Sequence, residues 1–325
     1  MKSMLKRSAI AALSVGVVAG LTLGAAPAAN ADSHNDIVFI QGVKGDGFYI
    51  TMDCGVKAAA KKAKVKVKTV GPAKFDATLQ KPILDSIVAG KPGAILIAPN
   101  DVKAMQRPLE NAAKKGIEII LVDTTVGKPK FAASAISSNN FAGGQEAYNA
   151  VKRLIPGGGK VMGISTIPGI STTDARDAGF KSAVGKSGGL FSYIGLEYSN
   201  NEPSKAAQIA TAAIAANPDL KAIFASNLFS AQGAATGIKQ AGKEGEIIII
   251  GFDAGPDQVK ALKDGTVQAL IAQSPYDIGT KGVEQAVKAM AGKKTKKKMT
   301  TGFTILTAGN VNTKAGKAAQ YLSKC

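Results

Sequence analysis

Several residue types on which enzymes commonly depend are scarce in this sequence. Tryptophan is absent, and the 325 residues include one histidine and two cysteines. The histidine, His34, lies in a polar segment near the start of the chain, where we expect a surface residue. Because it is the only histidine and lies in this polar segment, a histidine-based catalytic triad, a general-base histidine and a histidine-rich zinc site are excluded. We therefore expect no catalytic residues and no metal.

Nucleotide-binding motifs are also missing. The segment after the first expected strand reads Gly45-Asp46-Gly47-Phe48, which is not the glycine pattern of a dinucleotide fold. Gly185-Lys186-Ser187 resembles the end of a phosphate loop, but Phe180 stands where that loop needs its first glycine. No DNA-binding motif is recognisable. We expect no cofactor and no nucleic-acid partner.

A long hydrophobic run occurs only near the start of the chain. Three cations precede a mostly apolar run over residues 9–26, and Ala29-Asn30-Ala31 offers small residues for a signal peptidase. This pattern predicts a cleaved secretory signal over residues 1–31. The alternative is a retained membrane anchor, but alanine, glycine and Pro27 argue against one. With no cysteine at the cleavage site, we expect an unlipidated, soluble protein in the periplasm or at the extracellular face of the cytoplasmic membrane.

The two cysteines, Cys54 and Cys325, lie near opposite ends of the exported chain. In an exported protein such a pair indicates one disulfide, which would close a very long loop. The alternative is two free thiols, one buried and one on a frayed tail.

The chain is strongly basic, with a formal net charge of +18 at pH 7. Most of the excess is spread as single lysines, and one cluster comprises Lys293, Lys294, Lys296, Lys297 and Lys298. Basic composition raises the possibility of nucleic-acid binding. Export and the lack of an aromatic-rich basic patch instead favour a solvated face that an anionic cell envelope would attract.

Short apolar strands alternate with helices along the whole exported chain, which predicts parallel sheets built of βαβ units. The units are too many for one small sheet, so we predict an α/β protein with two doubly wound lobes. The first lobe comprises residues 35–138 and 274–300, and the second comprises residues 139–273 and 301–325. Chain crossings near Ser138, Gln273 and Thr301 would form a three-segment hinge. Asp101 is expected to cap a helix ending near Lys115, and one last strand is expected near residues 303–306, before a polar tail.

The most informative stretch follows a run of four isoleucines, residues 247–250. Such a run is typical of a strand buried on both faces, and Gly251-Phe252-Asp253 comes directly after it. The next strand ends in Gln273. Ligands bind at the carboxyl ends of strands in open α/β sheets, so these residues are candidate ligand contacts. The alternative is that Asp253 caps the following helix and Phe252 fills the core.

Other strand ends carry side chains of the same kinds. Carboxylates accept hydrogen bonds from pairs of hydroxyl groups, arginine donates in a fork, and aromatic rings cover apolar faces of a sugar. The candidate ligand-binding residues are Asp46, Phe48, Tyr49, Asn100, Asp123, Arg176, Asn227, Phe252, Asp253 and Gln273. Such a set suits a small neutral polyol. A carboxylate pair for glycoside hydrolysis, Asp123 with Asp253, is an alternative that nothing else in the chain favours.

Three motifs resemble the sugar-binding proteins of bacterial ABC importers, specifically the ribose-binding-like cluster of the type I periplasmic binding protein fold. They are Ile250-Gly251-Phe252-Asp253, Ile271-Ala272-Gln273-Ser274-Pro275 with the following Ile278-Gly279, and Arg176-Asp177-Ala178-Gly179-Phe180. The resemblance covers nearly the whole exported chain. It implies ligand contacts at Phe48, Tyr49, Asp123, Arg176, Asn227, Phe252, Asp253 and Gln273.

The chain departs from the ribose-binding pattern at four positions. Asp46 stands where that pattern has asparagine, and Thr124 where it has arginine. The first-lobe asparagine falls on Ala98, with Asn100 nearby, and a second-lobe aromatic falls near Asn201. These departures argue against ribose itself. A pentose, a hexose or a sugar alcohol is expected, with an amino-bearing ligand as an alternative.

The resemblance also implies a mechanism and a partner. A monomer would capture its ligand by lobe closure, and the closed form would deliver it to an ABC permease in the membrane. The alternative is a ligand-sensing receptor of the same fold that signals to a membrane sensor without transport. A transcription repressor of this fold is excluded by the expected signal and by the lack of a helix-turn-helix.

Overall fold

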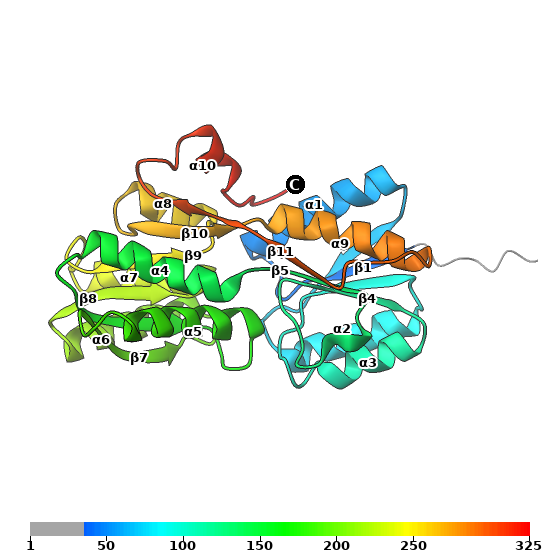
Figure 1. Ribbon diagram of the computed structural model, residues 1–325, viewed down its shortest axis with the longest axis horizontal. Coiled ribbons are helices and arrows are strands. Elements are labelled where there is room, and N and C mark those ends of the chain that lie inside the picture. Colours follow the sequence, from blue (N-terminus) through cyan, green and yellow to red (C-terminus); the bar gives the residue numbers. More distant parts are fainter. Residues whose placement is uncertain (1–35) are drawn as a thin grey trace, which may run out of the picture. The chain divides into compact units, whose positions relative to one another are not determined.

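The computed structural model describes residues 36–325, and the predicted signal sequence lies outside this range. The described chain forms two parallel-sheet α/β lobes, each built on a six-stranded sheet (Figure 1). The strand orders are β11-β5-β4-β3-β1-β2 in the first lobe and β12-β10-β9-β8-β6-β7 in the second. This arrangement confirms the predicted fold class.

The first sheet is parallel throughout. Its strands are β1 (Ile37–Ile40), β2 (Val67–Val70), β3 (Ala94–Ile97), β4 (Glu118–Val122), β5 (Ser134–Ser138) and β11 (Lys298–Thr301). Its helices are α1 (Gly47–Ala63), α2 (Ala77–Ala89), α3 (Gln106–Lys114), the 3₁₀ helix η1 (Pro129–Phe131) and α9 (Pro275–Met290). Helices α1 and α9 cover one face of the sheet, and α2 and α3 cover the other (Figure 1).

The second sheet is parallel except for its last strand, β12, which is antiparallel to β10. Its strands are β6 (Gly159–Ser165), β7 (Phe191–Tyr198), β8 (Leu220–Ala225), β9 (Ile248–Phe252), β10 (Ala269–Gln273) and β12 (Phe303–Leu306). Its helices are α4 (Asn140–Leu154), α5 (Ser171–Gly185), α6 (Pro203–Ala216), α7 (Leu228–Gln240), α8 (Pro256–Lys263) and α10 (Lys314–Ala318).

The chain passes between the two sheets three times. It leaves the first sheet after β5, returns after β10, and crosses again at Gly302 between β11 and β12. The segment just before the third crossing forms a strand, β11, that we did not predict. The lysine cluster was expected to precede a single strand, but its last member begins β11, which extends the first sheet beside β5.

Two further local predictions differ from the structure. Asp101 does not cap α3, which begins at Gln106; its Oδ1 instead accepts hydrogen bonds from the backbone N–H groups of Lys103 and Ala104, in the turn before the helix. The polar tail also contains a short helix, α10, capped by the Thr313 side chain.

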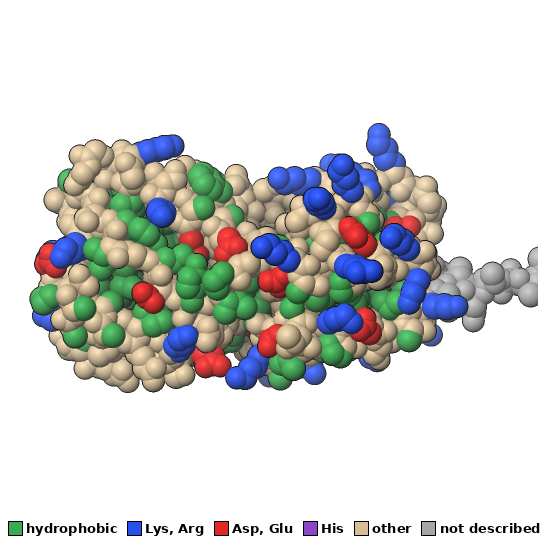
Figure 2. All heavy atoms as spheres, turned by 90° about the horizontal axis from the view of Figure 1, so that it is seen from below, with side chains coloured by type: hydrophobic (Ala, Val, Ile, Leu, Met, Phe, Trp, Pro, Cys, Tyr) green, Lys and Arg blue, Asp and Glu red, His purple; other side chains and the backbone are tan. Residues whose placement is uncertain are grey.

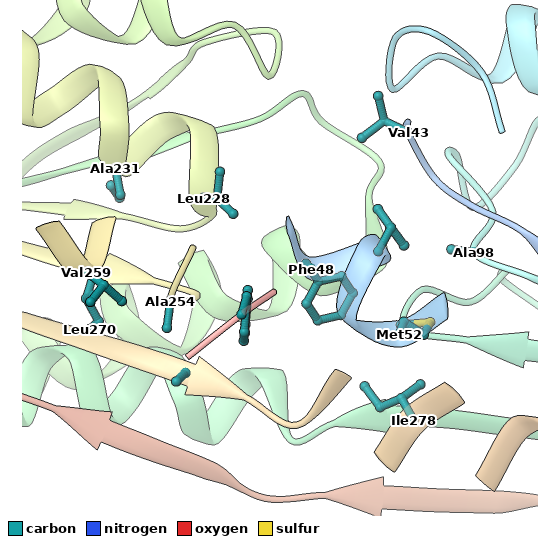
Figure 3. Close-up of a cluster of buried hydrophobic side chains, with 14 of the residues drawn as sticks. Val43, Phe48, Met52, Ala98, Leu228, Ala231, Ala254, Val259, Leu270 and Ile278 are labelled. Atoms are coloured by element: carbon teal, nitrogen blue, oxygen red, sulfur yellow. The ribbon is translucent and has the colours of Figure 1, made fainter. Parts of the chain in front are cut away.

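Apolar packing continues from one lobe into the other. The largest cluster of buried hydrophobic residues includes Phe48 and Met52 of α1 together with Leu228 and Ala254 of the second lobe. Figure 3 shows the ring of Phe48 at the start of α1, on the side that faces Leu228 and Ala254. The first turn of α1 is therefore held by hydrophobic contacts on both sides.

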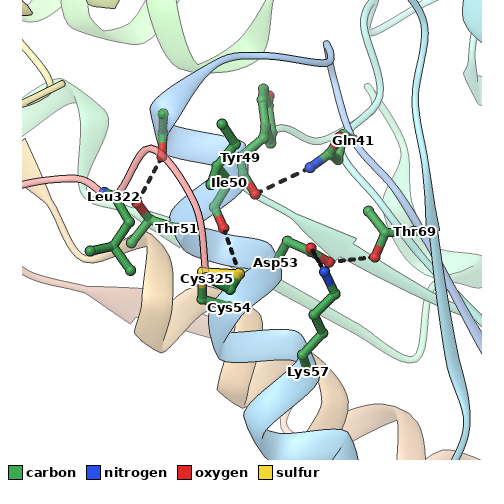
Figure 4. The surroundings of a disulfide bond; sticks show 11 residues. Gln41, Tyr49, Ile50, Thr51, Asp53, Cys54, Lys57, Thr69, Leu322 and Cys325 are labelled. Carbon is green, nitrogen blue, oxygen red and sulfur yellow. Dashed lines mark hydrogen bonds and ion pairs between the residues drawn. A yellow bond between two sulfur atoms is a disulfide. The ribbon is translucent and has the colours of Figure 1, made fainter. Parts of the chain in front are cut away.

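A disulfide joins Cys54 of α1 to Cys325, with their Cα atoms 5.3 Å apart (Figure 4). Beside it, the backbone N–H of Leu322 donates to Oγ1 of Thr51 at 2.7 Å. The predicted pairing is thus confirmed, and the alternative of free thiols is wrong. The bond fastens the end of the chain to the first lobe.

Over residues 36–325, no helix has both the length and the hydrophobicity that crossing a membrane requires.

Candidate ligand-binding site

The site is a pocket between the two lobes, at the edge where strands of both sheets end. Side chains from both lobes line it: Asp46, Phe48, Tyr49, Phe75, Asp123, Thr166, Ile170, Thr172, Thr173, Arg176, Asn201, Asn227, Asp253 and Gln273. Most of them come from loops that directly follow a strand. Parallel strands bring their carboxyl ends to one edge, so residues far apart in sequence meet there.

The first lobe contributes two carboxylates and two aromatic rings. Asp46 caps α1, and its Oδ1 accepts a hydrogen bond from the backbone N–H of Phe48 at 2.8 Å. The hydroxyl of Tyr49 donates to Oδ2 of Asp123 at 2.8 Å, and its ring packs edge-on against Phe48. Within the described residues, these contacts occupy one oxygen of each carboxylate. The other oxygen of each remains an available acceptor.

Asp253 is the best-supported acidic group of the second lobe. Its Oδ1 accepts from Nε2 of Gln273 at 2.7 Å and from the hydroxyl of Tyr321 at 3.0 Å. Its Oδ2 accepts from the backbone N–H of Leu228 at 3.1 Å. Three donors from three separate elements therefore fix the carboxylate in place.

Asp123 and Asp253 hold matching positions in the two lobes. Asp123 follows β4 with φ at 62°, and Asp253 follows β9 with φ at 78°. The backbone N–H of each donates to the neighbouring strand, at Ile136 and Ile271 respectively. Aspartate is among the few residues that tolerate this left-handed conformation. Each carboxylate then accepts a hydrogen bond from another element, from Tyr49 for Asp123 and from Gln273 for Asp253.

Arg176 is the cation of the pocket. Its side chain, only 3% exposed, donates from Nε to Oδ1 of Asn140 at 2.8 Å and from Nη1 to the carbonyl of Ser226 at 2.9 Å. Its guanidinium carbon lies 3.8 Å from the centre of the Phe252 ring, a cation–π contact. These contacts use Nε and Nη1, so Nη2 remains available as a donor.

Phe252 is completely buried beneath this arginine. On its other side, a Cβ added to Gly143 of α4 would lie 2.7 Å from the ring, so the helix contacts the ring directly. The ring thus supports Arg176 instead of lining the pocket. For Phe252, the core alternative weighed from the sequence describes the position best. Asp253, by contrast, does not cap α8, whose cap is Gly255.

Burial raises the pKa of two carboxyl groups in the pocket. The pKa of Asp46 rises from 3.8 to about 7, chiefly through burial and secondarily through the nearby charge of Asp253. Burial likewise raises the pKa of Asp123 to about 6, while Arg176 and the Tyr49 hydroxyl oppose that rise. Near neutral pH the pocket therefore holds carboxyl groups close to their titration midpoints.

These shifts predict a pH-dependent stability for the ligand-free protein. Because the folded protein keeps protons that the unfolded chain releases between about pH 4 and pH 7, stability should fall as pH rises through that range. We expect the Tm of wild type to be lower at pH 8 than at pH 5, and Asp46→Asn to reduce that difference by at least about 3 °C. Thermal unfolding followed by circular dichroism would measure it.

The matched control is Glu244→Gln, which makes the same carboxyl-to-amide change at an exposed position. It should leave the pH dependence unaltered. Equal pH dependence in wild type and Asp46→Asn would contradict the raised pKa of Asp46.

Two of the ten candidate residues from the sequence lie outside the pocket lining. One is Phe252, described above. The other is Asn100, whose Nδ2 donates to the carbonyl of Gly42 at 3.0 Å and whose backbone N–H donates to Oε1 of Gln80. Asn100 is buried, and it ties together two loops of the first lobe. The remaining eight candidates all line the pocket.

Several residues of this region were not among the candidates predicted from the sequence. Phe75 and Thr166 lie in loops after β2 and β6, so the same rule about strand ends could have found them. Ile170, Thr172, Thr173 and Asn201 also line the pocket. Tyr321 supports Asp253 from the far end of the chain, and nothing in its local sequence indicated that role.

Contacts between loops of the two lobes surround the pocket. The backbone N–H of Val102 donates to the carbonyl of Gly169 at 3.0 Å, and the backbone N–H of Thr125 donates to the Ser171 side chain at 2.9 Å. Nζ of Lys74 lies 3.1 Å from a carboxylate oxygen of Glu202. The described arrangement is therefore a closed one, and these contacts between the surrounding loops are polar.

Comparison with known proteins places this geometry in a family. A model of the periplasmic binding protein domain matches residues 37–294. The chain belongs to the periplasmic binding protein family. Members of this family are solute-binding proteins.

Curated relatives cover almost the same span. The ribose import binding protein RbsB of Salmonella typhimurium is 31% identical over 286 residues, which is 87% of this chain and 94% of that protein. The protein of the same name from Bacillus subtilis is 28% identical over 250 residues. That match covers 77% of this chain and 80% of the Bacillus subtilis protein, so this family member spans at least four-fifths of each of these two relatives.

Solved structures agree with the fold. An ABC transporter solute-binding protein from Agrobacterium vitis, bound with α-D-tagatopyranose, is 38% identical, with a TM-score of 0.86 over 88% of this chain and 99% of that one. A second from the same organism, with bound D-fucose, is 30% identical with a TM-score of 0.84, covering 88% of this chain and all of that one.

Proposed function

We propose that this periplasmic binding protein captures a small sugar or polyol by lobe closure and delivers it to an ABC permease. The observation that carries the proposal is the pocket itself. Two carboxylates from one lobe, a carboxylate and an arginine from the other, and aromatic rings converge in one pocket. A molecule with several hydroxyl groups around an apolar ring matches this combination.

The acidic residues are assigned to the hydroxyl groups of the ligand. The unpaired oxygens of Asp46 and Asp123 would accept hydrogen bonds from one side, and Asp253 would do so from the other. Arg176 would donate through Nη2, and the amides of Asn227 and Gln273 would add further bonds. Phe48 and Phe75 would cover the apolar face of the ring.

Closure follows from the division of the site between the lobes. An open form would expose either half of the pocket but could not make both sets of contacts at once. Ligand therefore shifts the population toward the closed form by the free energy of the additional contacts. Because one chain supplies the whole site, we infer that the protein acts as a monomer.

The relatives favour import over the signalling alternative. Those described above are a ribose import binding protein and ABC transporter solute-binding proteins. Export to the periplasm or to the outer face of the cytoplasmic membrane is part of the same proposal. It is supported by the family and by the signal-like residues 1–31, which lie outside the described chain.

A thermal-shift screen tests the proposal. The exported protein would be tested against pentoses, hexoses, sugar alcohols and amino sugars. A ligand present at about a hundred times its dissociation constant should add about 2.7 kcal/mol to the free energy of unfolding. The proposal is wrong if no member of the panel raises the Tm, or if an active compound is converted to a product.

A further inference from the structure

Positive charge is divided unevenly between the lobes. The first lobe (residues 36–138 and 274–301) carries twenty-three lysines and arginines against eleven acidic residues, whereas the second (139–273 and 302–325) carries fifteen against eleven. The first lobe thus holds three-quarters of the excess in the described chain. In Figure 2, lysine and arginine side chains gather over the half of the molecule that contains α1, α2, α3 and α9 in Figure 1.

The topology concentrates this charge further. In a parallel α/β sheet all strands begin at one edge, and the covering helices end at that same edge. In the first lobe this edge lies opposite the strand ends that line the pocket. Twelve exposed lysines lie in the last turns of its helices or in the connections from those helices to the next strands. We call them the distal lysine face: Lys61, Lys62, Lys64, Lys66, Lys91, Lys114, Lys115, Lys288, Lys293, Lys294, Lys296 and Lys297.

Acidic residues hardly offset this face. At the same edge stand Asp36, just before β1, and Glu118, the first residue of β4. Over residues 36–325, no lysine of the distal lysine face takes part in an ion pair. A single one, Lys297, donates a side-chain hydrogen bond, to the carbonyl of Ala132.

The corresponding edge of the second lobe also carries unpaired lysines, but acidic residues there pair with part of its positive charge. There Nζ of Lys160 lies 2.9 Å from a carboxylate oxygen of Asp219, and Nζ of Lys243 lies 2.6 Å from one of Glu246. Lys260 pairs with Asp264 in the same way. The two lobes share one architecture, so the fold alone does not require an uncompensated lysine face.

Helix stabilisation accounts for only part of the face. Lysines in the last turn of a helix interact favourably with its unpaired carbonyl groups. That explanation covers Lys61, Lys62, Lys114 and Lys288, which lie in last turns. It does not extend to Lys66 or to the members between α9 and β11. Exposed like charges repel one another, so this group needs an anionic partner to be stabilised.

We propose that the distal lysine face binds the surface of a lipid bilayer that contains anionic phospholipids. Its lysines come from four separate connections and cover one end of the lobe, which suits a broad surface better than a groove. Aromatic residues, on which nucleic-acid bases stack, are absent from residues 61–66 and 288–298. Lysine clusters are attracted to anionic lipid headgroups. Because the face lies away from the pocket, the bound protein could still open and close.

Sedimentation with lipid vesicles tests this proposal. Wild type should bind vesicles of equal parts phosphatidylglycerol and phosphatidylcholine at low salt, and should be released at about 0.5 M salt. The variant Lys61→Gln/Lys62→Gln/Lys293→Gln/Lys294→Gln should bind at least about tenfold more weakly. The matched control is Lys152→Gln/Lys186→Gln/Lys239→Gln/Lys263→Gln, which removes four exposed, unpaired lysines from the second-lobe edge. It should bind within about twofold of wild type.

Three results would overturn the proposal. The first is an equal loss of binding in both variants, which would indicate net charge alone. The second is equal binding to vesicles of pure phosphatidylcholine. The third is binding to soluble polyphosphate without binding to anionic vesicles, which would assign the face to a polymer. Both variants keep the pocket unchanged, so the outcome does not depend on the proposed sugar binding.

Discussion

Replacing Arg176 with alanine should weaken ligand binding by at least about a hundredfold. The change removes the cation of the pocket, and with it a charge-assisted hydrogen bond to the ligand. It also removes the positive charge that lowers the pKa of both Asp46 and Asp123, so the remaining carboxyl groups become harder to ionise. Isothermal titration calorimetry with the sugar found by the thermal-shift screen would measure the loss.

Two further variants separate binding from folding. Arg176→Lys keeps the charge but loses the fork that reaches Asn140 and the carbonyl of Ser226 at once, so we expect an intermediate loss. Lys181→Ala removes an exposed cation from the same helix, α5, and should bind as wild type does. A dissociation constant within about threefold of wild type for Arg176→Ala, in a folded protein, would move the binding site elsewhere.

Breaking the disulfide should lower the free energy of unfolding by up to about 5 kcal/mol. Cys54 and Cys325 are 271 residues apart, so the bond closes almost the whole described chain into one loop. In the chain-entropy account, such a loop strongly restricts the unfolded state. Denaturant unfolding of wild type, with and without a thiol reductant, would measure the change. The double variant Cys54→Ser/Cys325→Ser should be as unstable as the reduced protein and insensitive to reductant.

The same bond should affect ligand binding, because the tail that it fastens carries Tyr321. The hydroxyl of Tyr321 donates to Asp253 and accepts from the backbone N–H of Gln273, and its ring contacts Phe48. Tyr321→Phe keeps the ring and removes the hydroxyl, so it should weaken binding while the disulfide stays intact. If reductant changed neither stability nor affinity, the tail would have no structural role.

The sequence alone predicted the sheets because parallel α/β units have a strong local signature. The four isoleucines before Gly251 and the regular alternation of strand with helix indicated buried parallel strands. The last strand, expected near residues 303–306, is β12 (Phe303–Leu306), and the strand expected to end in Gln273 is β10 (Ala269–Gln273). Strand β11 was missed because it contains Lys298 and two threonines, and it pairs only through a distant partner, β5. Nothing in its own residues marks it as part of a sheet.

Eight of the ten predicted site residues line the pocket, because the topology of a parallel sheet already indicates which loops meet. The two exceptions, Asn100 and Phe252, lie at the same edge but turn their side chains inward. Side-chain direction depends on local backbone angles and on neighbouring helices, such as α4 against Phe252. The pattern of strands and helices along the sequence therefore does not predict the direction of these side chains.

What the sequence determined by itself was therefore the class of fold, the loops that carry the site and the kind of chemistry that those loops offer. Only the tertiary structure decided which of those side chains are free to bind. It placed Phe252 beneath Arg176, brought Tyr321 from the tail to Asp253, and left the lysines at the far edge of the first lobe without ion pairs. The physical reason is the separation along the chain over which each effect acts. Strand and helix preferences act between near neighbours, whereas burial, pairing and pKa depend on groups that the folded chain brings together.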